Sequence, residues 1–236
     1  MKIAVIGTGY VGLVTAAGLA ELGHKVTGTD KDVDKIAKVS RGTVPIYEPG
    51  LDALIESNLK KGSIVFSPDL DKTIAEAEVI FVCVGTPQRA DGRADMSQIE
   101  EVSRQIAQNL NRYKLVVEKS TVPVKTSFWI KRTISLYKRT DQEFDVASNP
   151  EFLREGSAVS DFLNPDRIII GVETDRAREF LTRIYDKAKD RLFITNTDTS
   201  ELIKHASTTF LASKIPYIHP IANLCEKKDP DVEKVA

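Results

Sequence analysis

The sequence predicts an α/β protein with a doubly wound, mostly parallel sheet, followed by the start of a helical central domain. Two patterns predict this class: short apolar segments alternate with helical patterns along residues 1–196, and the apolar segments are continuous rather than alternating with polar residues. Continuous apolar segments are typical of strands that helices cover on both faces, which is the arrangement in parallel sheets. A glycine-rich turn after the first segment supports the same class.

The expected elements follow one another in a regular order. The strands are expected at KIAVIG, HKVTGTD, SIVFSP, EVIFVCVG, KLVVEKS, FDVASN, RIIIGV and RLFITN. Helical patterns lie near residues 10–22, 31–41, 50–61, 97–111, 124–138 and 174–189. Gly, Pro, Asn and Asp favour loops at 42–50, 85–95 and 161–166. Because strands and helices alternate, we expect crossover connections and a doubly wound sheet.

The chain changes character after residue 196. Polar residues that can cap a helix precede an apolar helical pattern that begins near Thr199 or Ser200. We therefore predict two domains, 1–196 and 197–236, of which the second is the start of a central, dimerisation domain. Pro216 and Pro220 lie inside its helix, and each removes a backbone donor and disfavours helical geometry in the preceding residue. A kink or an early helix end is expected there.

Composition excludes several classes of function. The chain has 33 Lys and Arg against 34 Asp and Glu, so a net charge of −1 gives no general attraction to nucleic acid or an anionic membrane. No apolar segment approaches the length of a membrane span or a signal-peptide core, so we expect a cytoplasmic protein. Cys83 and Cys225 lie far apart and the three histidines are scattered. We expect reduced thiols and no metal site.

The glycine turn indicates a nucleotide-binding site. Gly7, Gly9 and Gly12 are spaced as G-x-G-x-x-G between the first strand and the first helix. In a Rossmann-like fold the first glycine permits the turn, the second admits a pyrophosphate, and the third lets the helix pack on the strand. The amides expected to face the phosphates are those of Thr8, Tyr10 and Val11. The alternative is a structural turn without a ligand.

An acidic residue indicates which dinucleotide binds. Asp30 follows the second expected strand, where a carboxylate accepts hydrogen bonds from the ribose hydroxyls and repels a 2′-phosphate. The sequence therefore predicts NAD rather than NADP, and residues 1–196 as an NAD-binding domain.

Five further stretches carry a family resemblance: GTVPIYEPGLD, FVCVGTP with the following DGRAD, VEKSTVPV, SNPEFLREGSAVSDFLNPDRIIIG and ELIKHA. Together they resemble the nucleotide-sugar dehydrogenases of the UDP-glucose/GDP-mannose dehydrogenase family, most of all its UDP-glucose branch. The resemblance extends along the whole chain. It implies two successive hydride transfers to NAD, which take the primary alcohol of UDP-glucose through an aldehyde and a cysteine thioester to a carboxylate.

The resemblance implies catalytic roles for three residues. Thr121 holds a water or the nicotinamide side of the site, Glu151 is a general base or orients water, and Lys204 stabilises an oxyanion. The cofactor contacts that it adds are Lys35, Thr86, Thr121 and Glu155. The substrate contacts are Glu151, Phe152, Leu153, Arg154, Lys204 and Thr208, the last at a position where the family has asparagine. The alternatives are a loop turn at Thr86, a helix cap at Thr121 and solvated surface positions for the charged residues.

The resemblance also implies features that these residues lack. In the family the nucleophilic cysteine lies further along the chain, before a C-terminal UDP-sugar domain, and we expect both to be absent here. Cys83 in an apolar strand and Cys225 in the helical tail are expected to be structural. The chain alone is then expected to be inactive, with UDP-glucose or a related nucleotide sugar as the partner of the complete enzyme and a homodimer formed through residues 199–226. An NAD-binding module without turnover and a β-hydroxyacid dehydrogenase-like enzyme stay open as alternatives.

Overall fold

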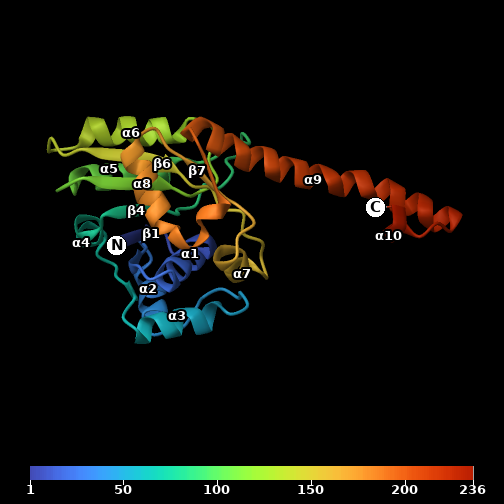
Figure 1. Ribbon diagram of the computed structural model, residues 1–236, viewed down its shortest axis with the longest axis horizontal. Coiled ribbons are helices and arrows are strands. Elements are labelled where there is room, and N and C mark those ends of the chain that lie inside the picture. The colour runs from blue at the N-terminus through green and yellow to red at the C-terminus, as the bar shows by residue number, and fades with distance from the viewer. Residues whose placement is uncertain (236) are drawn as a thin grey trace.

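The computed structural model describes residues 1–235, which form one eight-stranded sheet with helices on both faces and a long projecting helix (Figure 1). Along the sheet the strands are ordered β3-β2-β1-β4-β5-β6-β7-β8. They are β1 (Lys2–Ile6), β2 (Lys25–Thr29), β3 (Ile64–Phe66), β4 (Val79–Val82), β5 (Lys114–Glu118), β6 (Phe144–Ser148), β7 (Ile168–Gly171) and β8 (Leu192–Thr195). All eight correspond to the expected segments.

The sheet is mostly parallel, as predicted. Six neighbouring strands are parallel, in the order β3-β2-β1-β4-β5-β6 that is typical of dinucleotide-binding folds. The exception is the β6–β7 pair, which is antiparallel and joined at Ser148 and Gly171, while β7 and β8 are parallel to each other. The carboxyl ends of β1, β4, β5 and β6 therefore lie along one edge, where ligands bind in open α/β sheets.

The helices cover both faces of the sheet, except for the two at the C-terminal end, which extend away from it (Figure 1). They are α1 (Tyr10–Glu21), α2 (Val33–Val39), α3 (Leu51–Lys60), α4 (Leu70–Glu76), α5 (Ser97–Gln108), α6 (Thr126–Tyr137), α7 (Ala158–Leu163), α8 (Asp175–Ile184), the 3-10 helix η1 (Asp186–Arg191), α9 (Thr197–Lys228) and α10 (Val232–Val235). In β1, Ile3 and Val5 pack with α1 and α8, whereas Ala4 and Ile6 pack with α4, α5 and α6. Burial on both faces explains why the strands read as continuous apolar segments.

Two short helices, α4 and α7, were not predicted from the sequence. The sequence shows no helical pattern at α4, and α7 occupies the first half of the 161–166 segment, where a loop is predicted. The loop prediction is wrong there because tertiary packing outweighs the local turn signals. Phe162 of α7 packs so closely on α1 that a Cβ on Gly18 would lie 2.2 Å from its ring. Asp161 also accepts hydrogen bonds from Arg154 on the preceding loop.

Of the two outcomes expected for the last helix, a kink or an early end, the early end is wrong. Helix α9 continues through Pro216 and Pro220 to Lys228 and projects away from the sheet (Figure 1). Each proline leaves one carbonyl, four residues earlier, without its helical donor. Both prolines and Ala212 are exposed, so water can bond the carbonyls released at Ala212 and Pro216, which removes most of the penalty. Within residues 1–235 no helix combines the length and apolar character needed to cross a bilayer.

The start of α9 is fixed firmly to the sheet. The Asn196 side chain accepts a hydrogen bond from the Thr199 amide at 2.8 Å and caps the helix, which begins two residues before the expected start. A Cβ on Gly171 would lie 2.6 Å from Ser200, so α9 crosses the end of β7 in close contact. The carboxylate of Glu201 accepts hydrogen bonds from the amides of Lys125 and Ser127 and thereby caps α6. The division into two domains at this point stays a prediction.

Candidate active site

The glycine turn between β1 and α1 has the geometry of a ligand cradle. Gly7 has a φ of 94°, and a Cβ there would lie 2.6 Å from the Cys83 carbonyl oxygen. A Cβ on Gly12 would lie 1.7 Å from the Gly7 oxygen. Around Gly9, by contrast, no atom outside the residue and its two chain neighbours lies within 4 Å of the Cβ position. The fold itself requires Gly7 and Gly12, whereas the open space at Gly9 fits a ligand that approaches the backbone.

The amides at the start of α1 are the natural phosphate donors. Tyr10 and Val11 open the helix, where amides have no intrahelical acceptor and the helix dipole favours an anion. The expectation that the Thr8 amide also faces the phosphates is wrong, because that amide donates to Asp30 Oδ2 at 2.8 Å. The Thr8 interaction instead fixes the aspartate beside the turn.

Asp30 is held in place from several sides. Its Oδ2 accepts hydrogen bonds from the Thr8 amide and hydroxyl and from Lys35 Nζ at 2.6 Å, and its Oδ1 accepts one from the Asp32 amide. Burial opposes ionisation, yet Lys35 and the backbone amides hold the pKa of Asp30 below its ordinary value. The carboxylate stays charged, and Oδ1, which accepts a single hydrogen bond, keeps a lone pair for a ribose hydroxyl. Lys35, a predicted cofactor contact, lies beside it.

These residues open onto one cleft of about 460 Å³. Its lining includes Gly7, Gly9, Asp30 and Gly85 from the turns after β1, β2 and β4, and Lys35 from the first turn of α2. The cleft reaches Gly7 and Gly9, directly before the start of α1, at one point and the fixed carboxylate of Asp30 at another. That donor and acceptor set fits a dinucleotide, with the pyrophosphate at α1 and a ribose at Asp30.

The loops after β4 and β5 meet at the same edge. The Thr86 hydroxyl donates to the Thr121 carbonyl oxygen at 2.8 Å, and the Ser120 hydroxyl donates to the Val84 oxygen at 2.8 Å. The structure therefore brings together two predicted residues that are 35 positions apart. Thr121 is exposed at this junction. A catalytic role for its hydroxyl stays a prediction.

Glu151 and Lys204 form an acid–lysine pair, although the sequence separates them by 53 residues. Lys204 Nζ donates to Glu151 Oε1 and to the Glu151 carbonyl oxygen, both at 2.7 Å. Glu151 Oε2 accepts a hydrogen bond from the Leu153 amide. The two side chains are only 13% and 12% exposed. Lys204 is therefore not the solvated helix-surface lysine of the alternative interpretation.

A second cleft of about 440 Å³ adjoins this pair. The predicted substrate residues Glu151, Phe152, Leu153 and Arg154 all line it. The Phe152 ring lies 5.4 Å from Lys204 Nζ and 5.2 Å from the Arg167 guanidinium, so two cations flank one aromatic ring.

Three other predicted residues are placed less closely. The Arg154 side chain pairs with Asp161 at 2.6 Å, and the Arg154 amide donates to the same carboxylate. Thr208 lies one helical turn after Lys204 and is exposed. Glu155 is also exposed, in the loop near Tyr10. The structure gathers neither Glu155 nor Thr208 into the acid–lysine pair.

Sequence reasoning assigned no role to Glu48. This carboxylate is buried, accepts the Tyr10 hydroxyl, and accepts the amides of Gly156 and Ala158 at 2.8 Å each. These bonds hold the pKa of Glu48 below its ordinary value although burial raises it. Glu48 thus connects the start of α1 to the loop that carries Glu151. The only sequence signal for Glu48 was its place as the single acid in the apolar, proline-containing loop 42–50.

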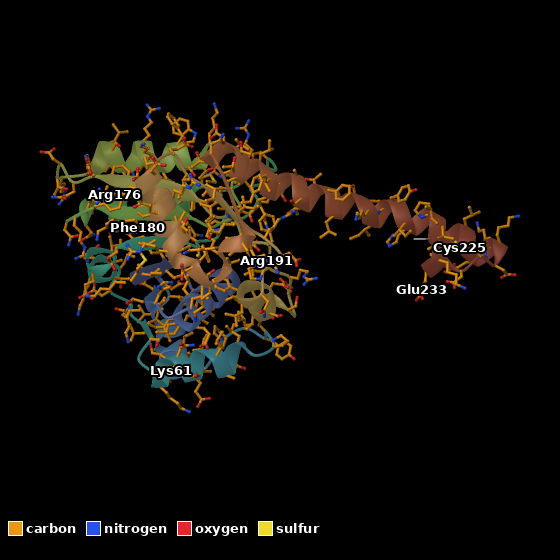
Figure 2. All side chains as sticks on the ribbon, viewed as in Figure 1. Lys61, Arg176, Phe180, Arg191, Cys225 and Glu233 are labelled. Atoms are coloured by element: carbon orange, nitrogen blue, oxygen red, sulfur yellow. The ribbon has the colours of Figure 1, made fainter. Side chains whose placement is uncertain are left out.

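Neither cysteine has the surroundings of a nucleophile. Burial raises the pKa of the Cys83 thiol to about 12, so the thiol stays neutral. Cys225 is buried near the far end of α9, away from the sheet and its clefts (Figure 2). Among residues 1–235, no three His, Cys, Asp or Glu side chains gather in a way that could hold a metal ion.

A glycine turn at a helix start, an acid after the second strand and a cleft at the sheet edge define the class: this is a Rossmann-like dinucleotide-binding domain. Comparison with known families then identifies it further. Residues 1–189 match the NAD binding domain of the UDP-glucose/GDP-mannose dehydrogenase family, and the chain belongs to that family. The cofactor is therefore NAD, as predicted.

Individual relatives agree with this assignment. The UDP-glucose 6-dehydrogenase of Rhizobium meliloti (strain 1021) is 48% identical over 244 residues, which cover 100% of this chain and 55% of the relative. A UDP-glucose dehydrogenase structure from Pyrobaculum islandicum has a TM-score of 0.94 at 38% identity and covers 99% of this chain and 55% of its own. A ternary complex of GDP-mannose dehydrogenase from Pseudomonas aeruginosa has a TM-score of 0.92 at 32% identity and covers 100% and 55%. The chain spans about half the length of the relatives it matches.

Proposed function

We propose that this chain carries the cofactor half of an enzyme that oxidises UDP-glucose to UDP-glucuronate with NAD. The observation that carries the proposal is the pairing of Glu151 with Lys204 beside the cleft that the loop 151–154 lines. The family match and the UDP-glucose relatives favour this substrate over the β-hydroxyacid alternative.

The paired residues can handle the proton of a primary alcohol. Each Glu151 oxygen already accepts one hydrogen bond and keeps a lone pair, so the carboxylate can accept the hydroxyl proton directly or through one water. Lys204 uses two of its three N–H donors on Glu151 and can direct the third at the developing alkoxide. Such a fixed cation contributes several kcal/mol in a site that excludes water. Bound NAD supplies the hydride acceptor.

The second oxidation needs a residue that these 236 positions do not offer in a suitable form. A thiolate forms the covalent adduct from which a second hydride can leave. Cys83 is buried and neutral, and Cys225 lies near the far end of α9 (Figure 2). We therefore propose that the chain alone binds NAD without turning over UDP-glucose, and that the nucleophile belongs to a part of the enzyme outside the matched half.

Assembly through α9 is part of the proposal. This helix exposes large apolar side chains along its projecting part: Phe210, Leu211, Ile215 and Tyr217, each 56–70% exposed. Surfaces of this kind mark association sites. We propose a homodimer formed through residues 199–226, which includes this surface.

Complementation tests the function. The purified chain is mixed with NAD and UDP-glucose, with and without the remaining C-terminal part of the Rhizobium meliloti relative, and NADH is followed by absorbance. We expect no NADH from the chain alone and NADH in the mixture. Lys204→Met should lower the rate by about 10²–10³-fold, as for removal of one oxyanion donor. The exposed Lys227→Met, on the same helix, is the matched control.

Two outcomes would contradict the proposal. NADH and UDP-glucuronate from the chain alone would place the nucleophile within these residues. The control is a mixture of the two halves of the relative itself. If that control produces NADH and the mixture with this chain does not, the result would favour the alternative of an NAD-binding module without turnover. GDP-mannose in place of UDP-glucose tests the choice of sugar nucleotide.

A further inference from the structure

Lys119 is a buried lysine that the proposed chemistry leaves unused, and burial lowers the pKa of its amine. It follows β5 directly, is 4% exposed and lines the same cleft as Glu151. Its Nζ donates to the carbonyl oxygen and to Oδ1 of Asn149, both at 3.2 Å. No carboxylate among residues 1–235 lies within ion-pair distance of it. A buried ammonium is costly to desolvate, so its position calls for a physical reason.

Asn149 is the point through which Lys119 acts. Its Oδ1 also accepts the Tyr185 hydroxyl at 2.6 Å, its Nδ2 donates to the Ile169 oxygen, and its amide donates to the Glu118 oxygen. Every polar group of Asn149 is therefore bonded, and the residue is 1% exposed. Lys119 supplies a donor to both of its oxygens.

The chain leads from Asn149 to Glu151 through a single proline. Pro150 has a fixed φ, so few soft dihedrals separate the Asn149 carbonyl from the Glu151 side chain. Once the Asn149 carbonyl is fixed, the loop has little freedom to move the Glu151 carboxylate away from Lys204. The direction of the Asn149 carbonyl therefore controls the geometry of the Glu151–Lys204 pair.

We propose that Lys119 is a positioning residue: by holding both oxygens of Asn149 it sets the start of the loop that places Glu151 against Lys204. Its relevance to the reaction rests on the proposed function. The competing explanation is a lysine that only stabilises the fold. Lys114, at the other end of β5, is such a residue, because it is fully buried and donates to the carbonyl oxygens of Ala75 and Ala77 beside the end of α4.

A double-mutant cycle separates the two explanations. The coupling between Glu151→Gln and Lys204→Met is measured by urea unfolding in three backgrounds: wild type, Lys119→Met and Lys114→Met. In the wild type we expect a coupling of about fivefold or more in the unfolding equilibrium constant, as for contacting residues. Lys119→Met should reduce the coupling to less than about twofold. Lys114→Met should lower stability and leave the coupling unchanged.

Equal coupling in all three backgrounds would overturn the proposal. If Lys119→Met does not fold, Lys119→Gln decides, since its side chain keeps a polar end but is one bond shorter and draws the donor back from both oxygens of Asn149. We expect Lys119→Gln to weaken the Glu151–Lys204 coupling as well, and unchanged coupling would again overturn the proposal. The cycle needs neither NAD nor sugar nucleotide, so its result stands even where UDP-glucose turnover fails.

Discussion

Replacing Gly9 with valine separates ligand binding from folding. Gly9 has φ −73° and ψ −167°, values that any residue adopts, and no atom outside the residue and its two chain neighbours lies within 4 Å of its Cβ position. The cost to folding is that of a poorer helix N-cap, about 1 kcal/mol. The protein should therefore fold with nearly its normal stability.

The expected loss of NAD affinity is much larger. A branched side chain at this position fills the space through which a pyrophosphate reaches the amides of Tyr10 and Val11. Hydrogen bonds to a charged group contribute about 1.5–3 kcal/mol each, so losing both costs about 3–6 kcal/mol. That corresponds to an increase of about 10²–10⁴-fold in the Kd for NAD.

Calorimetric titration with NAD and urea unfolding together measure both effects. Gly12→Ala is the contrasting variant, because its Cβ would lie 1.7 Å from the Gly7 oxygen and should destroy the fold itself. A Gly9→Val protein that folds and binds NAD as tightly as the wild type would refute the placement of the pyrophosphate at α1.

Three further predictions follow from the same structure. Calorimetry should show tighter binding of NAD than of NADP, since Asp30 is charged and fixed where a 2′-phosphate would lie, and equal affinities would contradict this. Glu48→Gln should lower the free energy of unfolding by about 2 kcal/mol at neutral pH. The folded state lowers the pKa of Glu48, so its contribution to the free energy of unfolding is complete above the unfolded pKa of about 4.3. The contribution is lost as the pH falls through the folded pKa. Unfolding curves at several pH values can check this dependence. Light scattering should show a dimer that Phe210→Ser with Ile215→Ser dissociates; a wild-type monomer at high concentration would count against association through α9.

The strands and the glycine turn were predictable because local sequence determines them. A strand buried on both faces has to be apolar throughout, the turn gives Gly7 a φ of 94°, and a Cβ on Gly12 would meet the Gly7 oxygen. The same local rules failed at Pro216 and Pro220. There the exposed surroundings let water bond the released carbonyls, and exposure of one helix cannot be derived from its own sequence.

Polar networks that join distant segments were not predictable from spacing. Glu48 bonds the amide of Gly156 across 108 positions, and Lys119 bonds Asn149 across 30. As isolated residues an acid and a lysine are most often solvated, so their burial shows only once the fold brings their partners together. The resemblance to nucleotide-sugar dehydrogenases indicated Glu151 and Lys204 individually, whereas the hydrogen bonds between them come from the structure.

The hydrogen bonds of Glu48 also explain how the start of α1, where we place the dinucleotide, is held at a fixed position relative to the acid–lysine pair. Tyr10 opens α1, its amide is one of the proposed phosphate donors, and its hydroxyl donates to Glu48. Burial raises the pKa of Tyr10, and the neighbouring Glu48 adds to the shift, so the phenol keeps its proton and remains a donor. Since Glu48 also takes the amides of Gly156 and Ala158, moving the loop 151–157 away from α1 would break several hydrogen bonds to a buried charge at once. The fold therefore fixes α1 relative to the loop 151–157 without a ligand, and the oxidation proposed above would need such fixed placement of a hydride acceptor and an alcohol.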